Sequence, residues 1–147
     1  MNADSAAPRV DLTVAVPAFN EVDTLPELHR RVAAALDPLD LTWELVVVDD
    51  MSTDGTRDLL RGLAKRDPRV RGVLLSRNFG LARAHMAALR HSSGTWTVMM
   101  DADLQDEPEA IPRMLELARG GHDVVYGVRE SRGEGRMTRF LTAAFYR

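Results

Sequence analysis

The sequence predicts an α/β fold of three layers, in which a mainly parallel β-sheet lies between helices. Short apolar stretches alternate along the chain with longer stretches whose apolar residues recur at helical spacing. The short stretches are almost continuously hydrophobic, as expected where helices cover both faces of a parallel sheet. Strands that alternate with helices in this way form parallel sheets with right-handed crossovers.

The predicted elements follow one another closely. Strands are expected at residues 12–17, 43–48, 70–75, 95–100 and 123–126. Helices are expected at residues 21–36, 56–66, 81–90 and 106–119, and the last of them ends at Gly120 and Gly121. Asp106 is expected to cap the helix that begins at Pro108, with Glu109 in the capping-box position, in preference to binding a metal.

The composition excludes several classes of protein. With 147 residues, 45% of them hydrophobic and 28% charged, the chain fits one ordinary globular domain. The net charge of −3 argues against a general nucleic-acid binder. The sequence has no cysteine, and therefore no disulfide framework or thiolate metal site. It shows neither a secretory signal at its N-terminus nor a run of about 18 apolar residues that would span a membrane.

The stretch after the fourth predicted strand carries two carboxylates two residues apart. At an extended strand end, Asp101 and Asp103 point to the same side and Ala102 points away. Two carboxylates held this close repel each other unless a cation lies between them, and oxygen ligands suit Mg²⁺ or Mn²⁺. Taken alone, the pair fits a loop that caps the next helix better than it fits a metal site.

The other strand ends favour a metal and ligand site. Polar residues also follow the first three predicted strands, at residues 17–21, 49–56 and 76–80. Because ligands of open α/β sheets bind beyond the carboxyl ends of the strands, four such ends indicate one site. Three other α/β classes fail on their motifs. The chain has no dinucleotide-binding G-x-G-x-x-G, no Walker phosphate loop, and no lysine late in the sheet, as a phospho-acceptor receiver requires.

Together, these motifs resemble family 2 glycosyltransferases with the GT-A fold. The resemblance rests on residues 17–21, 46–56 and 101–106, and residues 77–80 and 126–129 narrow it to the polyprenyl-phosphate hexosyltransferases. It implies transfer of a hexose from a UDP- or GDP-sugar to a polyprenyl phosphate, with inversion and with Mg²⁺ or Mn²⁺ as cofactor. The alternative function is a non-catalytic module that binds a nucleotide sugar or a partner.

The resemblance also implies roles for individual residues. Asp101 and Asp103 would hold the metal ion and act in catalysis together with Arg129. The residues expected to contact the nucleotide sugar come from all four strand ends: Pro17, Phe19, Asn20, Glu21, Asp49, Asp50, Arg77, Gly80, Asp101, Ala102, Asp103 and Gln105.

The chemistry of the reaction agrees with these residue types. The charge that develops on the departing diphosphate must be neutralised, and a divalent ion or an arginine does this. Arg77 and Arg129 each follow a strand and are the candidates, although either could instead form a surface ion pair. No general base stands out, and a phosphate acceptor with a second pKa near ~6 needs none. His85 occupies a position at which relatives usually carry small or apolar residues, and we expect it at a surface or packing position.

The two ends of the chain carry different signals. We expect residues 1–10 to form a flexible tail, residues 11–130 the nucleotide-sugar-binding domain, and residues 131–147 a basic amphipathic helix. Such a helix lies on a membrane surface, here through residues 136–147, or packs on the domain's own sheet; both remain open. The expected location is the cytoplasm, at the inner face of the membrane. Because relatives continue beyond this point with an acceptor-side part, the chain is expected to hold the donor-binding half.

Overall fold

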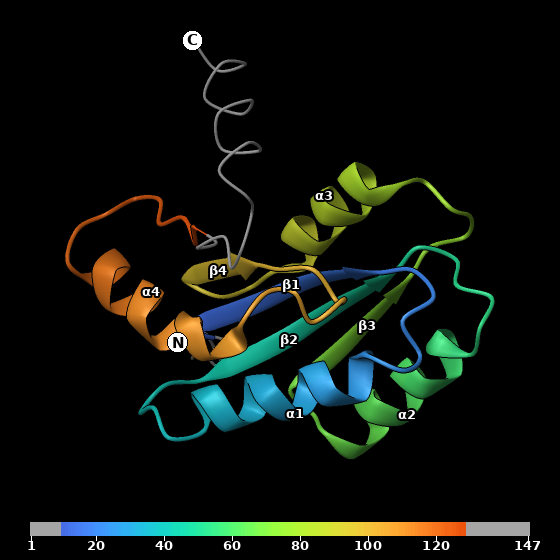
Figure 1. Cartoon of the computed structure of the whole chain (residues 1–147), viewed down its shortest axis with the longest axis horizontal. Helices are drawn as coiled ribbons and strands as arrows, with labels where there is room; N and C mark the ends of the chain where they lie inside the picture. The colour runs from blue at the N-terminus through green and yellow to red at the C-terminus, as the bar shows by residue number, and fades with distance from the viewer. Residues whose placement is uncertain (1–9, 129–147) are drawn as a thin grey trace, which may run out of the picture.

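The computed structural model describes residues 10–128, which form one sheet with helices on both faces (Figure 1). The strands are β1 (Leu12–Ala18), β2 (Trp43–Asp49), β3 (Val70–Leu74) and β4 (Trp96–Met99), all parallel in the order β3-β2-β1-β4. The helices are α1 (Leu25–Leu36), α2 (Thr56–Arg66), α3 (Leu81–His91) and α4 (Ile111–Arg119), with a 3₁₀ turn, η1 (Pro108–Ala110), before α4. The predicted α/β architecture with a parallel sheet is confirmed.

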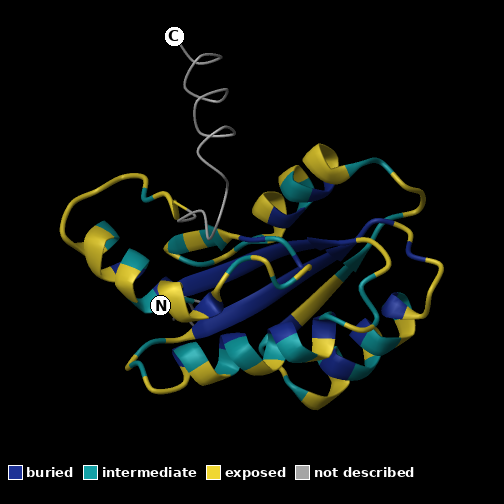
Figure 2. Ribbon diagram, in the orientation of Figure 1, coloured by how far each residue is buried: buried dark blue, intermediate teal, exposed yellow. Residues whose placement is uncertain are grey.

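The two faces of the sheet carry cores of different size. On one face α1, α2 and α4 cover the sheet, and the buried side chains there include Val14 and Val16 of β1 and Leu28 of α1. On the other face α3 is the one helix of residues 10–128 that packs on the sheet, through Ala84 and Ala88 against small or branched residues of β1 and β2. Figure 2 shows β1 and β2 as the most deeply buried elements. The three layers follow from helices on both sides of these two apolar strands.

Strand β1 determines where the strand ends meet. All seven of its residues are buried, and it pairs with β2 on one side and β4 on the other. In this register Ala18 lies beside Asp49, and Ala15 lies beside Met99. The carboxyl ends of β1, β2 and β4 therefore open at one edge of the sheet, which is the edge predicted to carry the site.

A buried carboxylate links β1 and β2 near their amino ends, opposite the carboxyl ends that carry the cavity. Glu44 of β2 accepts hydrogen bonds from Thr13 Oγ1 at 2.7 Å and from the backbone N and Oγ of Ser93 at 2.8 and 2.7 Å. Burial opposes ionisation of Glu44, but these hydrogen bonds outweigh it, and the pKa of Glu44 lies below its usual value. Gly94 approaches Thr13 so closely that an added Cβ would lie 2.5 Å from the Thr13 backbone nitrogen. The α3–β4 connection is thereby fixed to the sheet.

One predicted strand is wrong. Residues 123–126 form no strand, and Val124 and Tyr126 are 63% and 82% exposed. Their β-branched and aromatic composition favours a strand, but such a segment is stable only beside a strand that bonds its backbone. Within residues 10–128 the outer edge of β4 has no strand partner.

Two helices begin later in the structure than the sequence predicted. Helix α1 begins at Leu25, because residues 21–24 form a turn in which the Leu25 nitrogen donates to the Glu21 carbonyl. The helix predicted over 106–119 is divided into η1 and α4, with a proline in the first turn of each.

No helix within residues 10–128 is long and apolar enough to cross a bilayer. The predicted N-terminal tail, Arg129 and the predicted helix over 131–147 lie outside the described residues, apart from Val10.

Candidate functional site

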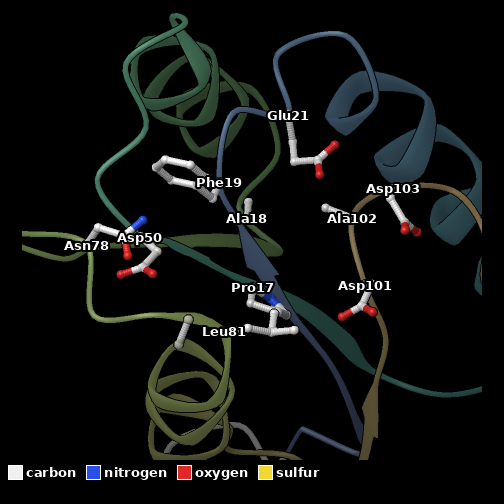
Figure 3. A pocket seen from close by; sticks show the side chains of 11 residues that line it. Pro17, Ala18, Phe19, Glu21, Asp50, Asn78, Leu81, Asp101, Ala102 and Asp103 are labelled. Carbon is white, nitrogen blue, oxygen red and sulfur yellow. The ribbon is translucent and has the colours of Figure 1, made fainter.

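A cavity of about 240 Å³ lies at the carboxyl ends of β1, β2 and β4. Pro17 and Ala18 of β1 lie at its centre, Asp50 and Asn78 on one side, and the turn after β4 on the other (Figure 3). The full lining consists of Pro17, Ala18, Phe19, Glu21, Asp50, Asn78, Leu81, Ala84, Asp101, Ala102 and Asp103. Polar side chains on two sides of an apolar floor form a cleft that a ligand with two polar ends can span.

The two carboxylates after β4 sit on a tight turn rather than on an extended strand end. Ala102 is buried in the main core, whereas Asp101 and Asp103 remain accessible and line the cavity. Leu104 has a φ of +62°, and Asp103 Oδ1 accepts a hydrogen bond from the Gln105 nitrogen at 3.0 Å. The turn therefore places both carboxylates at the cavity by a geometry other than the predicted one.

The predicted capping role of Asp106 is wrong. The N-cap residue of η1 is Glu107, and its side chain forms no capping hydrogen bond. Asp106 Oδ2 instead accepts from the Asp101 nitrogen at 3.1 Å. Glu109 accepts from Arg31 Nε and Nη2 of α1 at 2.9 and 2.6 Å. Asp106 thus stabilises the backbone of the turn, and Glu109 ties η1 to α1.

Asp49 and Asp50 are adjacent but face different surroundings. Asp49 is fully buried; its carboxylate accepts from the Ser52 nitrogen at 3.3 Å. Arg57 Nε lies 3.0 Å from Asp49 Oδ2, an ion pair without hydrogen-bond geometry. Asp50, 3% exposed, lines the cavity and accepts from the Phe79 and Gly80 nitrogens at 2.7 and 2.8 Å. The sequence placed both aspartates at the ligand, and the structure brings only Asp50 to the cavity.

The loop after β1 is braced by the loop after β2. Asn20, with a φ of +58°, donates from its backbone nitrogen to Ser52 Oγ at 2.9 Å and accepts from the Thr53 nitrogen at 2.8 Å. The Glu21 nitrogen donates to Thr56 Oγ1 at 2.9 Å. The Asn20 side chain is thus engaged within the protein, while the neighbouring Phe19 and Glu21 line the cavity.

The loop after β3 and the first residue of α3 contribute residues that sequence reasoning did not identify. Asn78 and Leu81 line the cavity, whereas the expected Arg77 is exposed and stacks on the Phe79 ring at 4.6 Å. Gly80 has a φ of +88° at the start of α3, a conformation that favours glycine. Asn78 could have been found from its place between two predicted ligand residues.

The sequence-predicted residues thus divide into three groups. Those that line the cavity are Pro17, Phe19, Glu21, Asp50, Asp101, Ala102 and Asp103. Those that do not are Asn20, Asp49, Arg77, Gly80 and Gln105. Arg129 lies outside the described residues.

The cavity is acidic. Glu21, Asp50, Asp101 and Asp103 line it, and no lysine or arginine within residues 10–128 does. Within the described part of the chain, His85 of α3 lies beside one of these carboxylates, with its Nε2 3.4 Å from Asp101 Oδ1. In the same part of the chain no three His, Cys, Asp or Glu side chains converge as a complete metal site. Such a carboxylate pair suits an ion that completes its coordination with water and substrate phosphate, as Mg²⁺ does.

Comparison with known proteins gives the family. The model of "Glycosyl transferase family 2" matches residues 13–145. The chain belongs to glycosyl transferase family 2. This confirms the resemblance and the enzyme class inferred from the strand-end motifs.

Curated relatives of the chain include undecaprenyl-phosphate 4-deoxy-4-formamido-L-arabinose transferases. The chain is 41% identical over 128 residues to an undecaprenyl-phosphate 4-deoxy-4-formamido-L-arabinose transferase of Salmonella paratyphi A. It is 44% identical over 122 residues to the protein of the same name from Edwardsiella ictaluri. These matches cover 86% and 82% of this chain, but only 39% and 38% of the relatives. The chain therefore spans about two fifths of the length of these relatives.

Two solved structures share the fold of this chain. The mannosyltransferase PcManGT from Pyrobaculum calidifontis, in complex with GDP-Man and Mn²⁺, has a TM-score of 0.63 and 33% identity, over 74% of this chain and 32% of that one. S. aureus TarS in complex with UDP-GlcNAc has a TM-score of 0.62 and 23% identity, over 76% of this chain and 32% of that one. The GT-A fold predicted from the sequence is confirmed by these likenesses.

Proposed function

We propose that the cavity binds a nucleoside diphosphate sugar with Mg²⁺ or Mn²⁺, and that the protein transfers the hexose to a polyprenyl phosphate. The observation that carries this proposal is the arrangement of polar groups in one cavity. Asp50 and Asn78 lie on one side, Asp101 and Asp103 on the other, and the end of β1 lies between them (Figure 3). A nucleoside at the first side would place its diphosphate beside the paired carboxylates.

The residues present fit a divalent cation. Asp101 and Asp103 offer oxygen ligands, and the cavity lining within residues 10–128 supplies no lysine or arginine to balance them. When bound there, the ion would neutralise the charge that develops on the departing diphosphate. Arg77, in the loop that Asp50 holds, and Arg129 are proposed as further cations toward that diphosphate.

The transfer itself requires little acid–base chemistry from the protein. The bond between the sugar anomeric carbon and the diphosphate oxygen breaks, and its electron pair leaves with the nucleoside diphosphate. An oxygen of the acceptor phosphate forms the new bond from the opposite face, which inverts the anomeric carbon. Because a phosphate monoester with a second pKa near ~6 is largely ionised at neutral pH, no side chain has to remove a proton. The protein contributes orientation, through the buried floor at Pro17 and Ala18 and the loop fixed by Asp50.

The acceptor class rests on the relatives. The curated relatives named above are undecaprenyl-phosphate transferases, which supports a polyprenyl phosphate as acceptor. An acceptor in a membrane requires the protein to work at its surface. We therefore propose that residues 136–147, with three arginines and no acidic residue, bring the protein to the cytoplasmic face of the membrane.

Thermal unfolding with a panel of nucleotide sugars tests donor binding. UDP-GlcNAc and GDP-mannose are added with and without Mn²⁺. A ligand present at 100 times its dissociation constant adds about 2.7 kcal/mol, or roughly 5–10 °C for a chain of this size. Asp103→Asn is expected to remove the metal-dependent part of that shift. The fold should survive, because the asparagine oxygen can still accept from the Gln105 nitrogen.

The exposed Asp123, which does not line the cavity, provides the control as Asp123→Asn. An Asp103→Asn protein that keeps the full metal-dependent shift would contradict the metal assignment. Transfer of labelled sugar to undecaprenyl phosphate separates the transferase from a module that only binds nucleotide sugars.

A further inference from the structure

The contact between His85 and Asp101 joins a helix to the turn that carries the paired carboxylates. His85 belongs to α3, and its Nε2 lies 3.4 Å from Oδ1 of Asp101. The two side chains are 22% and 42% exposed, so the contact lies at the rim of the site rather than in open solvent. The contact is at ion-pair distance without hydrogen-bond geometry, and Nε2 is the ring nitrogen that faces the carboxylate.

The packing of α3 fixes the position of this histidine. Ala84 and Ala88 are buried against Ala15 of β1 and Val48 of β2. Small side chains at these positions allow the helix backbone to approach the sheet closely. The neighbouring residue, His85, is consequently held beside the turn after β4, where it contacts Asp101.

The start of α3 is fixed separately. Asp50 accepts from the Phe79 and Gly80 nitrogens, directly before the first residue of the helix. The helix that carries His85 is therefore anchored at its first turn and along its buried face. The position of His85 is therefore fixed relative to the Asp101 carboxylate on the turn.

Asp101 is held from two directions. Its backbone nitrogen donates to Asp106 Oδ2 at 3.1 Å, which fixes the main chain. Its carboxylate meets His85 through one oxygen, Oδ1. The distance of 3.4 Å exceeds the usual N–H···O length, so the contact directs the carboxylate more than it stabilises the fold.

We propose that His85 is a positioning residue, which orients the Asp101 carboxylate for a divalent cation shared with Asp103. This inference rests on the proposed function, since it concerns the metal that the carboxylate pair would hold. Removing a residue that contacts and orients a metal ligand, without binding the metal itself, typically lowers metal affinity by about 10–100-fold. Because the contact is long and partly exposed, we expect an effect at the lower end of that range.

Mn²⁺ binding by the 147-residue chain tests the proposal without an activity assay. Free Mn²⁺ is measured by electron paramagnetic resonance during titration, with Mn²⁺ alone and with added UDP or GDP. His85→Leu keeps an apolar side chain of similar size but no donor, and it should weaken Mn²⁺ binding about tenfold. His85→Gln retains a side-chain N–H donor and should restore most of the affinity. His91→Leu, at the exposed end of the same helix, is the matched control and should bind as the wild type does.

The outcomes separate this inference from the proposed function. Wild-type protein that binds no Mn²⁺ in any arm overturns the metal-dependent function, and the role of His85 with it. Wild-type binding that His85→Leu leaves unchanged overturns the inference alone. Equal loss in His85→Leu and His85→Gln, at unchanged melting temperature, also overturns it, because the donor would then be irrelevant.

Discussion

Asp50 offers a sharp test of how the cavity is held together. Its two carboxylate oxygens accept from the Phe79 and Gly80 nitrogens at 2.7 and 2.8 Å, and the residue is 3% exposed. In Asp50→Asn one of these oxygens becomes an NH₂ group that faces a backbone N–H. A hydrogen bond to a charged group contributes about 1.5–3 kcal/mol, and a buried donor without acceptor costs a similar amount. We therefore expect a loss of about 2–3 kcal/mol in unfolding free energy.

For a domain of this size, that loss corresponds to a decrease of about 4–12 °C in melting temperature. Circular dichroism gives the melting curve, and amide hydrogen exchange reports Phe79 and Gly80 individually; both amides should exchange faster in the variant. Asp58→Asn is the matched control, because the Asp58 side chain is 86% exposed on α2. A melting temperature and amide protection equal to those of the wild type would refute the proposed anchoring of the loop.

Two further predictions concern Glu44, near the amino end of β2, and the C-terminal segment. Glu44→Gln should lower the melting temperature at pH 7 by about 2–8 °C, from roughly 1–2 kcal/mol of lost hydrogen bonding. Because the pKa of Glu44 is lowered in the folded protein, its contribution is complete above its unfolded pKa of about 4.3 and disappears as the pH falls through the folded pKa. The difference between wild type and variant should therefore shrink below about pH 4, whereas a constant difference, or an equal effect of the exposed Glu116→Gln, would contradict it. The proposed membrane segment predicts that the protein sediments with anionic vesicles and that salt releases it; Phe140→Asp should abolish sedimentation, and equal partitioning of both proteins would favour a helix packed on the domain.

The sequence predicted the sheet well because the strands are governed by burial. The apolar runs of β1 and β2 are nearly continuous, and both strands were placed to within one residue at each end. The starts of α2 and α3 were also predicted correctly, but those of α1 and α4 were not. For α1, the turn at residues 21–24 bonds to Asp54 and to Thr56 of α2, and not to its own sequence neighbours alone. The strand expected at residues 123–126 failed because a strand depends on a partner, which local composition does not encode.

Contacts across the site were harder to predict than the site itself. Adjacent aspartates look alike in a sequence, yet Asp49 is the last residue of β2 and turns into the protein, whereas Asp50 faces the cavity. Asp106 resembles a helix cap by spacing, but it accepts from Asp101 instead. His85 carries no motif; only the closeness of α3 to the sheet, through two alanines, brings it to Asp101.

The acidic lining of the cavity has a consequence for the order in which ligands arrive. A free nucleoside diphosphate carries the same sign of charge as Glu21, Asp101 and Asp103, so it is repelled from the cavity before any cation is bound. Productive encounters are then those in which the cation is already in place, or in which cation and nucleotide enter as one complex.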